Sequence, residues 1–265
     1  MPKLSASLIV YSRCFAGLGE GTKSLDFARE AVDVLGFDET QTPDIYNAQM
    51  ALAQSNLGVL CANSGLRVEA IAAGRSALKV FEDLAERYPE RLNKYLSNAC
   101  QNLGVAMRKK NWLRETSEIY QRYSDATRQL ADNGHSEFTN TSADFLSDLS
   151  VLYSVLGNSY KGLEAAQESV RRYKMLPSGH SDLPRRLGSA LSIVADRLEE
   201  LGQYQRATIY DQEAIQTVYA ATDRSPLWNR TLEEVTRDYM NRAGRRSLPT
   251  DSVLVEKALK CLRQP

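Results

Sequence analysis

The 265-residue sequence predicts an all-α protein, folded as a solenoid of stacked antiparallel helix pairs. A pattern of apolar, small and turn-forming residues returns about every 46 residues through almost the whole chain. Within each copy, apolar residues follow one another at steps of three and four, which places them on one face of a helix. No stretch shows a convincing strand pattern. Each repeat is therefore expected to contain a first helix, a tight turn, a second helix and a longer loop.

The tight turn of each repeat is marked by a glycine or an asparagine. These residues adopt left-handed backbone angles at low cost, and for that reason they commonly end helices. The spacing between them is constant to within one residue, so we expect one turn per repeat. The five residues are Gly19, Gly65, Asn111, Gly157 and Gly202.

Small side chains occupy two further fixed positions, five and twelve residues after each turn. A small residue at a fixed helical position allows a neighbouring helix to approach closely. Tyr123 is the exception, and it leaves the packing angle of the third repeat open. The first set is Ser24, Ala70, Thr116, Gly162 and Ala207, and the second is Ala31, Ala77, Tyr123, Ser169 and Ala214.

Helix breakers at similar spacing separate the repeats: Pro43, Pro89, His135, Ser181 and Pro226. We interpret 1–265 as a single helical-repeat domain with approximate repeats 5–50, 51–96, 97–142, 143–187 and 188–233. A degenerate cap follows at 234–265. In it, Gly244 to Arg246 should break a helix, and Asp251 or Thr250 should cap a last helix over 252–263. The chain enters its first helix without a preceding cap, which suggests either a preceding segment or dimerisation through that end.

One repeat carries a family resemblance. Leu57-Gly58, Cys61, Gly65, Ala70 and Ala77 take the positions that define the tetratricopeptide repeat, and Leu201 to Ala207 matches its turn and second-helix start. The common repeat has about 34 residues. The longer repeat here resembles kinesin-light-chain-like arrays, and more closely arrays of fungal and actinobacterial signalling proteins. The resemblance implies a right-handed superhelix and a role in protein–protein contact.

Composition sets limits on partners and location. Lys plus Arg equals Asp plus Glu at 33 each, so nothing calls for nucleic acid or an anionic membrane. No apolar run approaches the roughly 18 residues of a membrane span. The apolar N-terminal segment fits the repeat better than it fits a signal peptide. Cys14, Cys61 and Cys100 lie in apolar helical runs, as small hydrophobic residues of a reducing compartment do. We expect a cytoplasmic protein.

Candidate chemistry is sparse, and we expect neither catalytic residues, nor a cofactor, nor a metal. The four cysteines form no Cys-x-x-Cys pair. His135 and His180 both stand in Gly-His-Ser, but the two motifs are one repeat apart and are interpreted as equivalent loops. An enzyme would instead need a cleft that gathers one of these histidines with distant acids or cysteines.

The expected binding surface is the concave groove lined by the first helices. Asn56 and Asn102 hold equivalent positions there, and either could bond a peptide backbone or a neighbouring helix. Basic residues in the third repeat and acids in the fourth and fifth would suit a peptide of mixed charge, unless they are outer-face charges. The candidate residues are Ser55, Asn56, Gln101, Asn102, Val105, Arg108, Lys109, Asp144, Asp148, Asp196 and Glu199.

The sequence therefore favours a non-catalytic scaffold that binds a peptide or a helix of a protein partner, or another domain of the same protein. An alternative is a sensor or autoinhibitory segment of a larger signalling switch, next to a nucleotide-binding or caspase-like protease domain. The oligomeric state is left open.

Overall fold

The computed structural model describes residues 1–36, 43–89, 92, 94–177, 179, 182–222, 228–246 and 248–262, without the side chains of 43–46, 94–98 and 222. In this part of the chain the regular structure is entirely helical, with twelve α-helices and one short 3-10 helix. The predicted all-α fold is confirmed. Four predictions fall outside the described residues. They concern the breaks at Ser181 and Pro226, the loop residue His180, and Arg263 at the end of the predicted final helix.

The chain consists of two compact units, Met1–Thr141 and Ser142–Pro265. The division falls next to the predicted boundary between the third and fourth repeats, at residues 142 and 143.

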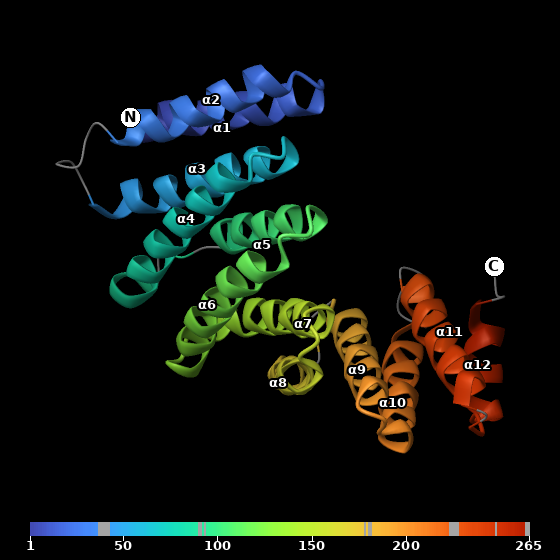
Figure 1. Cartoon of the computed structure of the whole chain (residues 1–265). Helices are drawn as coiled ribbons and strands as arrows, with labels where there is room; N and C mark the ends of the chain where they lie inside the picture. The colour runs from blue at the N-terminus through green and yellow to red at the C-terminus, as the bar shows by residue number, and fades with distance from the viewer. Residues whose placement is uncertain are drawn as a thin grey trace. The chain divides into compact units, whose positions relative to one another are not determined.

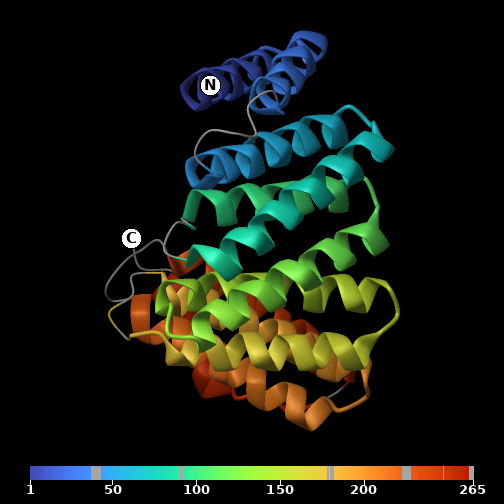
Figure 2. The ribbon, with the colours of Figure 1, turned by 90° about the vertical axis from the view of Figure 1, so that its left-hand side faces the viewer.

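Unit 1 contains three antiparallel helix pairs. They are α1 (Pro2–Gly17) with α2 (Gly21–Gly36), α3 (Pro43–Asn63) with α4 (Arg67–Arg87), and α5 (Lys94–Lys109) with α6 (Leu113–Asp132), followed by the 3-10 helix η2 (Ser136–Phe138). The pairs are layered in chain order (Figures 1 and 2). The first helices contact one another in sequence, α1 with α3 and α3 with α5. Their side chains therefore share one face of the unit.

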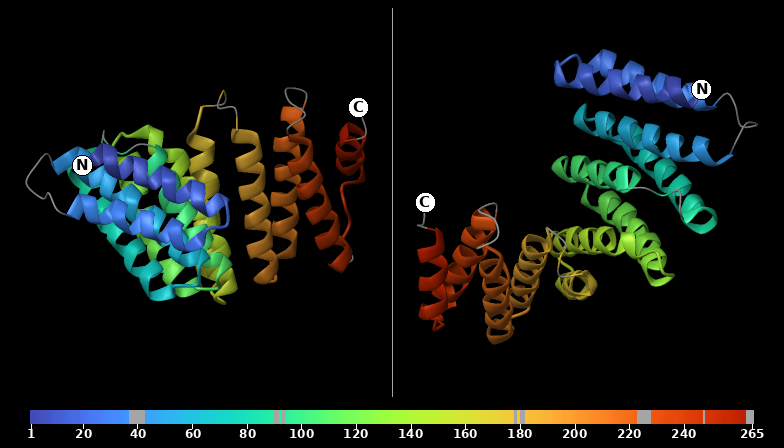
Figure 3. Two further views of the ribbon diagram at one scale, coloured as in Figure 1. Left: turned by 90° about the horizontal axis from the view of Figure 1, so that it is seen from above. Right: turned by 180° about the vertical axis from the view of Figure 1, so that it is seen from behind.

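Unit 2 continues the same alternation of first and second helices. Its helices are α7 (Thr139–Val155, which begins at the end of unit 1), α8 (Ser159–Met175), α9 (Leu183–Glu200), α10 (Tyr204–Thr222), α11 (Asn229–Arg246) and α12 (Ser252–Leu262). Figure 3 shows α9 to α12 side by side, and each contacts the next. Their apolar faces form one core that includes Leu191, Val194, Ile215 and Val218.

The five predicted turn residues all have a left-handed backbone. The φ angles are 77° at Gly19, 80° at Gly65, 61° at Asn111, 78° at Gly157 and 73° at Gly202. Asn111 is the one non-glycine residue with positive φ in the described part of the chain. The prediction that these five residues form the tight turns of the repeats is thus confirmed.

The residues of both small-residue sets are buried, and glycines of the first helices also allow a close approach of neighbouring side chains. A β-carbon added at Gly58 in α3 would lie 2.7 Å from Leu103 Cδ1 in α5, and one at Gly104 would lie 1.8 Å from Tyr120 Cε1. Tyr123, the exception to the small-residue rule, is also fully buried. Its ring packs edge-on against Phe81 with centroids 4.9 Å apart. The third repeat thus accommodates a large ring where the others have a small side chain.

Three local predictions need correction. The helix α11 continues through Gly244 to Arg246, because an exposed helical glycine costs only about 1 kcal/mol and does not by itself end a helix. Cys14 is exposed, not buried like Cys61 and Cys100. The second repeat begins its first helix at Pro43, ahead of the predicted frame at 51.

The cap of the last helix is now assigned. Asp251 Oδ1 accepts a hydrogen bond of 3.0 Å from the backbone N–H of Leu254, as an N-cap carboxylate does. Of the two predicted alternatives, Asp251 is the capping residue.

Candidate functional site

A groove of about 850 Å³ runs along the first helices of unit 1. Its lining comes from α1, α3 and α5, so the groove follows directly from the stacking of equivalent helices. Most of the surface is aliphatic. The apolar lining residues are Ala6, Ile9, Ala16, Leu52, Val59, Leu60, Ala99, Val105 and Ala106.

Three asparagines and a glutamine add polar groups to this surface: Asn56, Asn63, Asn102 and Gln49. Asn56 Nδ2 donates a 2.8 Å hydrogen bond to Ser12 Oγ in α1, and Asn56 also lines the groove. Asn102, one repeat further on, is exposed in the groove. Of the two alternatives for Asn56, the structure shows the bond to a neighbouring helix, and a bond to a peptide backbone stays a prediction.

The charge of the groove is positive. Arg13 of α1 and Lys109 of α5 both line it and are exposed. No aspartate or glutamate occurs among the described lining residues. In an apolar channel with two cations, a carboxylate gains more from charge pairing than it would on an open surface, because nearby low-dielectric walls reduce screening.

Two buried thiols lie on the helices that line the groove, Cys61 on α3 and Cys100 on α5. Ser55 lines the groove but is buried, and Cys61 and Cys100 are buried in the same layer of the unit. Burial raises the pKa of the Cys61 thiol to about 11 and that of Cys100 to about 12. Both thiols are therefore protonated at neutral pH and behave as small apolar side chains.

The remaining predicted residues of unit 1 lie beside the groove. The backbone carbonyl of Gln101 accepts a 2.9 Å hydrogen bond from the Tyr120 hydroxyl, and the Gln101 side chain is half-buried outside the lining. Arg108 is half-buried and also outside it. Of the predicted residues, those that line the groove are Ser55, Asn56, Asn102, Val105 and Lys109.

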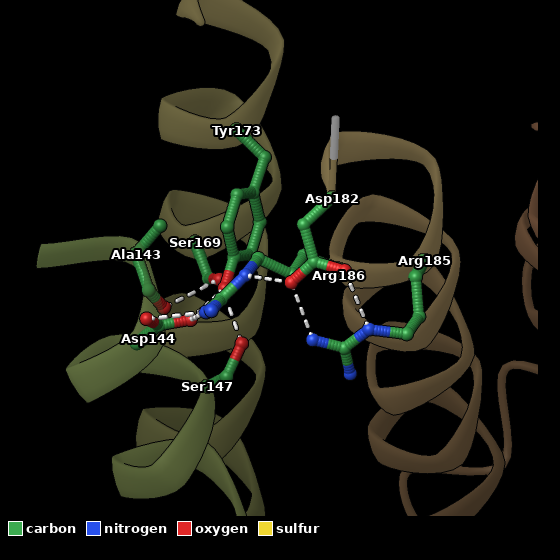
Figure 4. A network of polar contacts seen from close by, with 8 residues as sticks. All are labelled: Ala143, Asp144, Ser147, Ser169, Tyr173, Asp182, Arg185 and Arg186. Atoms are coloured by element: carbon green, nitrogen blue, oxygen red, sulfur yellow. Dashed lines mark hydrogen bonds and ion pairs between the residues drawn. The ribbon is translucent and has the colours of Figure 1, made fainter. Parts of the chain in front are cut away.

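The predicted acid Asp144 of unit 2 is part of a polar network between α7, α8 and α9 (Figure 4). It accepts hydrogen bonds from the Tyr173 hydroxyl and the Arg186 guanidinium. Arg186 Nε also donates to Asp182 at 2.6 Å, and Arg185 binds the same carboxylate. Burial opposes ionisation of Asp182, but the hydrogen bonds from the two arginines hold its pKa below the usual value.

Nearby, a shorter chain of hydroxyls links α7 to α8. Ser169 Oγ donates to the carbonyl of Ala143 at 2.8 Å and lies 2.8 Å from Ser147 Oγ. Together with the ion pairs, these bonds join each helix to the next. The carboxylate of Asp144 thus binds Tyr173 and Arg186 within the unit.

The two predicted acids of α9 also face arginines. Asp196 pairs with the buried Arg242, whose guanidinium also binds Asp211 and Ser192. Glu199 pairs with Arg245 at 2.9 Å. Asp148, the last predicted acid, is half-buried in α7. In unit 2 the predicted acids therefore lie mostly at contacts between helices.

Of the two histidines considered for catalysis, the structure describes His135. His135 Nδ1 lies 3.5 Å from Glu137, a neighbour in the same loop. No group of three or more potential metal ligands occurs among the described side chains. Of the helices described, none combines the length and hydrophobicity needed to cross a bilayer.

Comparison with known proteins supports the fold. No protein-family profile matches the chain, and no curated protein matches it by sequence. Among solved structures, BtubC (BKLC) from P. vanneervenii is 18% identical, with a TM-score of 0.60 over 83% of this chain and 82% of its own. A putative kinesin light chain of Podosopora anserina with TPR-like repeats is 16% identical, with a TM-score of 0.56 over 85% and 99%.

The fold is that of a tetratricopeptide-like repeat array. The apo form of RapI resembles the array similarly, at 13% identity and a TM-score of 0.58 over 97% of this chain and 82% of its own. At these identities the likeness concerns the fold of the array.

Sequence reasoning missed several lining residues of the array's groove, above all Arg13. The repeat register contains the signal that would have identified it. Arg13 precedes Val59 by 46 residues, and Val59 precedes Val105 by the same interval. All three line the groove. Extending the prediction of Val105 backwards through the array would therefore have identified both other residues.

Proposed function

We propose that this chain is a non-catalytic protein-interaction scaffold and that the groove of unit 1 binds an acidic, partly apolar segment of a protein partner. The observation that carries the proposal is the composition of the groove. About 850 Å³ of space is lined by aliphatic side chains, three asparagines and two cations, without an acid among the described lining residues. Its volume lies within the range of small-molecule pockets, about 300–1,000 Å³, and accommodates a few residues of an extended chain.

Each group has a role in this proposal. Ile9, Val59 and Val105 would contact apolar side chains of the segment, and burial of that surface would supply most of the affinity. Asn102 would exchange hydrogen bonds with the peptide backbone through its amide donor and acceptor. Arg13 and Lys109 would pair with carboxylates and select acidic partners.

The scaffold proposal also fits the rest of the described chain. In unit 2 the acids Asp144, Asp196 and Glu199 bind arginines of neighbouring helices. Such contacts fix the helices of the unit to one another. A groove that is already formed in the free chain suits binding, because less ordering is needed when a partner docks.

A peptide-display selection with the whole chain as bait tests this function. We expect enriched sequences to combine acidic and aliphatic residues. Asn102→Trp should abolish the enrichment, because Asn102 is exposed in the groove and an indole there would fill it. Lys110→Trp, at an exposed residue outside the lining, is the matched control. Enrichment that survives Asn102→Trp would show that binding occurs elsewhere.

A further inference from the structure

The first helix carries an exposed apolar stripe that the groove does not use. Leu4, Tyr11 and Leu18 follow one another at intervals of seven residues, which places them on one side of α1 and its C-cap. Their exposed fractions are 50%, 56% and 74%. Ile9 and Arg13, which line the groove, belong to a different side of the helix. The stripe is thus a second surface, separate from the proposed binding groove.

The repeat register shows what this face does elsewhere. Tyr11 corresponds to Leu57 and, one repeat later, to Leu103 of α5. Leu103 is fully buried. Its side chain fills a notch left by the glycines of the preceding helix pair, since a β-carbon would lie 2.7 Å from it at Gly58 and 3.0 Å from it at Gly74. The face that α1 exposes is therefore the face by which α5 packs on other helices.

The stripe is compatible with a copy of itself. Ser7 and Cys14, exposed beside it, carry no formal charge, so two such faces meet without repulsion between like charges. Lys3 lies at one end of the stripe, and Glu20, which pairs with Lys23 of its own chain at 2.6 Å, lies just beyond the other. When two copies run antiparallel, Lys3 of each approaches Glu20 of its partner, which is a favourable pairing of charges.

The spacing also has two-fold symmetry. Tyr11 is seven residues from both Leu4 and Leu18, so an antiparallel pair brings Leu4 of one copy against Leu18 of the other and sets the two Tyr11 rings together. Self-complementarity of this kind is what an isologous two-fold interface requires. We propose that a second copy of this chain covers the stripe, with α1 packed antiparallel on its counterpart and the two-fold axis at Tyr11. Both grooves stay open in this dimer.

Sedimentation of the whole chain over a range of concentrations is the first test. We expect a monomer–dimer equilibrium. Tyr11→Lys and Leu18→Lys should each raise the dissociation constant at least about 30-fold, the loss expected for one buried anchor. Ile209→Lys is the control, because Ile209 is 62% exposed on α10. A chain that remains monomeric throughout, or a dimer indifferent to both stripe variants, would overturn the proposal.

Cross-linking then tests the geometry. In a Cys14→Ser, Cys261→Ser background, Tyr11→Cys should give a covalent dimer with a short thiol cross-linker, since the two thiols meet at the axis. Leu4→Cys should not give a cross-linked dimer, because the residue-4 thiols of the two chains would lie about 21 Å apart along the helices. Efficient cross-linking of both variants would indicate a parallel pair and contradict the proposed arrangement, and so would the failure of Tyr11→Cys.

Discussion

Leu103 of α5 packs on Gly58 of α3 so closely that a β-carbon on residue 58 would lie 2.7 Å from Leu103 Cδ1. This contact joins the second and third repeats and sets the spacing of the helices that line the groove. The spacing therefore depends on the missing side chain at Gly58 and, beside it, at Gly74, where a β-carbon would lie 3.0 Å from Leu103.

Gly58→Ala should destabilise the protein by up to about 2 kcal/mol, because overpacking a filled core costs about 1–3 kcal/mol and the helix propensity of alanine offsets about 1 kcal/mol of that cost. Unfolding in urea, followed by circular dichroism, measures this change. Gly244→Ala is the matched control. Gly244 is helical, and a β-carbon there would meet nothing within 4 Å. That variant should be stabilised by about 0.5–1 kcal/mol through helix propensity. Equal effects at the two glycines would contradict the packing role of Gly58.

Asn111 ends α5 with a φ of 61°, a conformation that costs other L-residues roughly 1–2 kcal/mol. We expect Asn111→Ala to lower the free energy of unfolding by about 1 kcal/mol. Asn111→Gly should leave it unchanged or raise it slightly, because glycine has no β-carbon to strain. Thermal melts of the wild type and the two variants measure these differences in stability. A more stable alanine variant would show that the turn is held by contacts and not by backbone preference.

Such turns could be predicted from sequence because their signal is local. Gly19, Gly65 and Gly157 recur at a fixed interval, and each follows from the backbone freedom of one residue. The stacking of pairs was likewise implied by the small residues. The charges were harder to place, because Asp144 looks identical in sequence whether it faces a groove or Arg186. That choice depends on the side-chain geometry of three separate helices.

The groove shows the same limit. Val105, Arg108 and Lys109 were all predicted to lie there, but Arg108 lies outside the lining. One residue corresponds to a rotation of about 100° around a helix, so neighbouring charges can belong to different surfaces. Only the positions of the adjacent helices determine which of the two borders the open space.

The buried pair of Arg242 and Asp211 predicts a pH-dependent effect. The exposed fractions of these side chains are 8% and 2%, and Arg242 Nε lies 2.9 Å from Asp211 Oδ2. Burial raises the pKa of Asp211 above its ordinary value. Arg242→Met would leave this carboxylate without its cation and should cost about 3–5 kcal/mol at pH 7.

This cost should shrink as the pH falls. Between its unfolded pKa, about 3.9, and its higher folded pKa, Asp211 binds more protons in the folded state, so lowering the pH stabilises the fold. In Arg242→Met the folded pKa of Asp211 rises further, so the pH range in which added protons stabilise the fold becomes wider. Urea unfolding measures the free energy of unfolding at pH 7 and at pH 5. The difference in this free energy between Arg242→Met and wild type should be smaller at pH 5. Arg230→Met, at an exposed pair with Glu234, should change stability by less than about 0.5 kcal/mol at both.

The affinity of one display-selected acidic peptide for two charge-reversal variants tests the proposed groove most directly. Lys109 lines the groove and the adjacent Lys110 does not, although both are exposed. We predict that Lys109→Glu weakens binding at least about tenfold, or 1.4 kcal/mol, and that added salt reduces the difference. Lys110→Glu should change the affinity less than about twofold, as expected for a charge outside the interface. Equal losses in the two variants, or no loss in either, would contradict the assignment of the groove as the binding site.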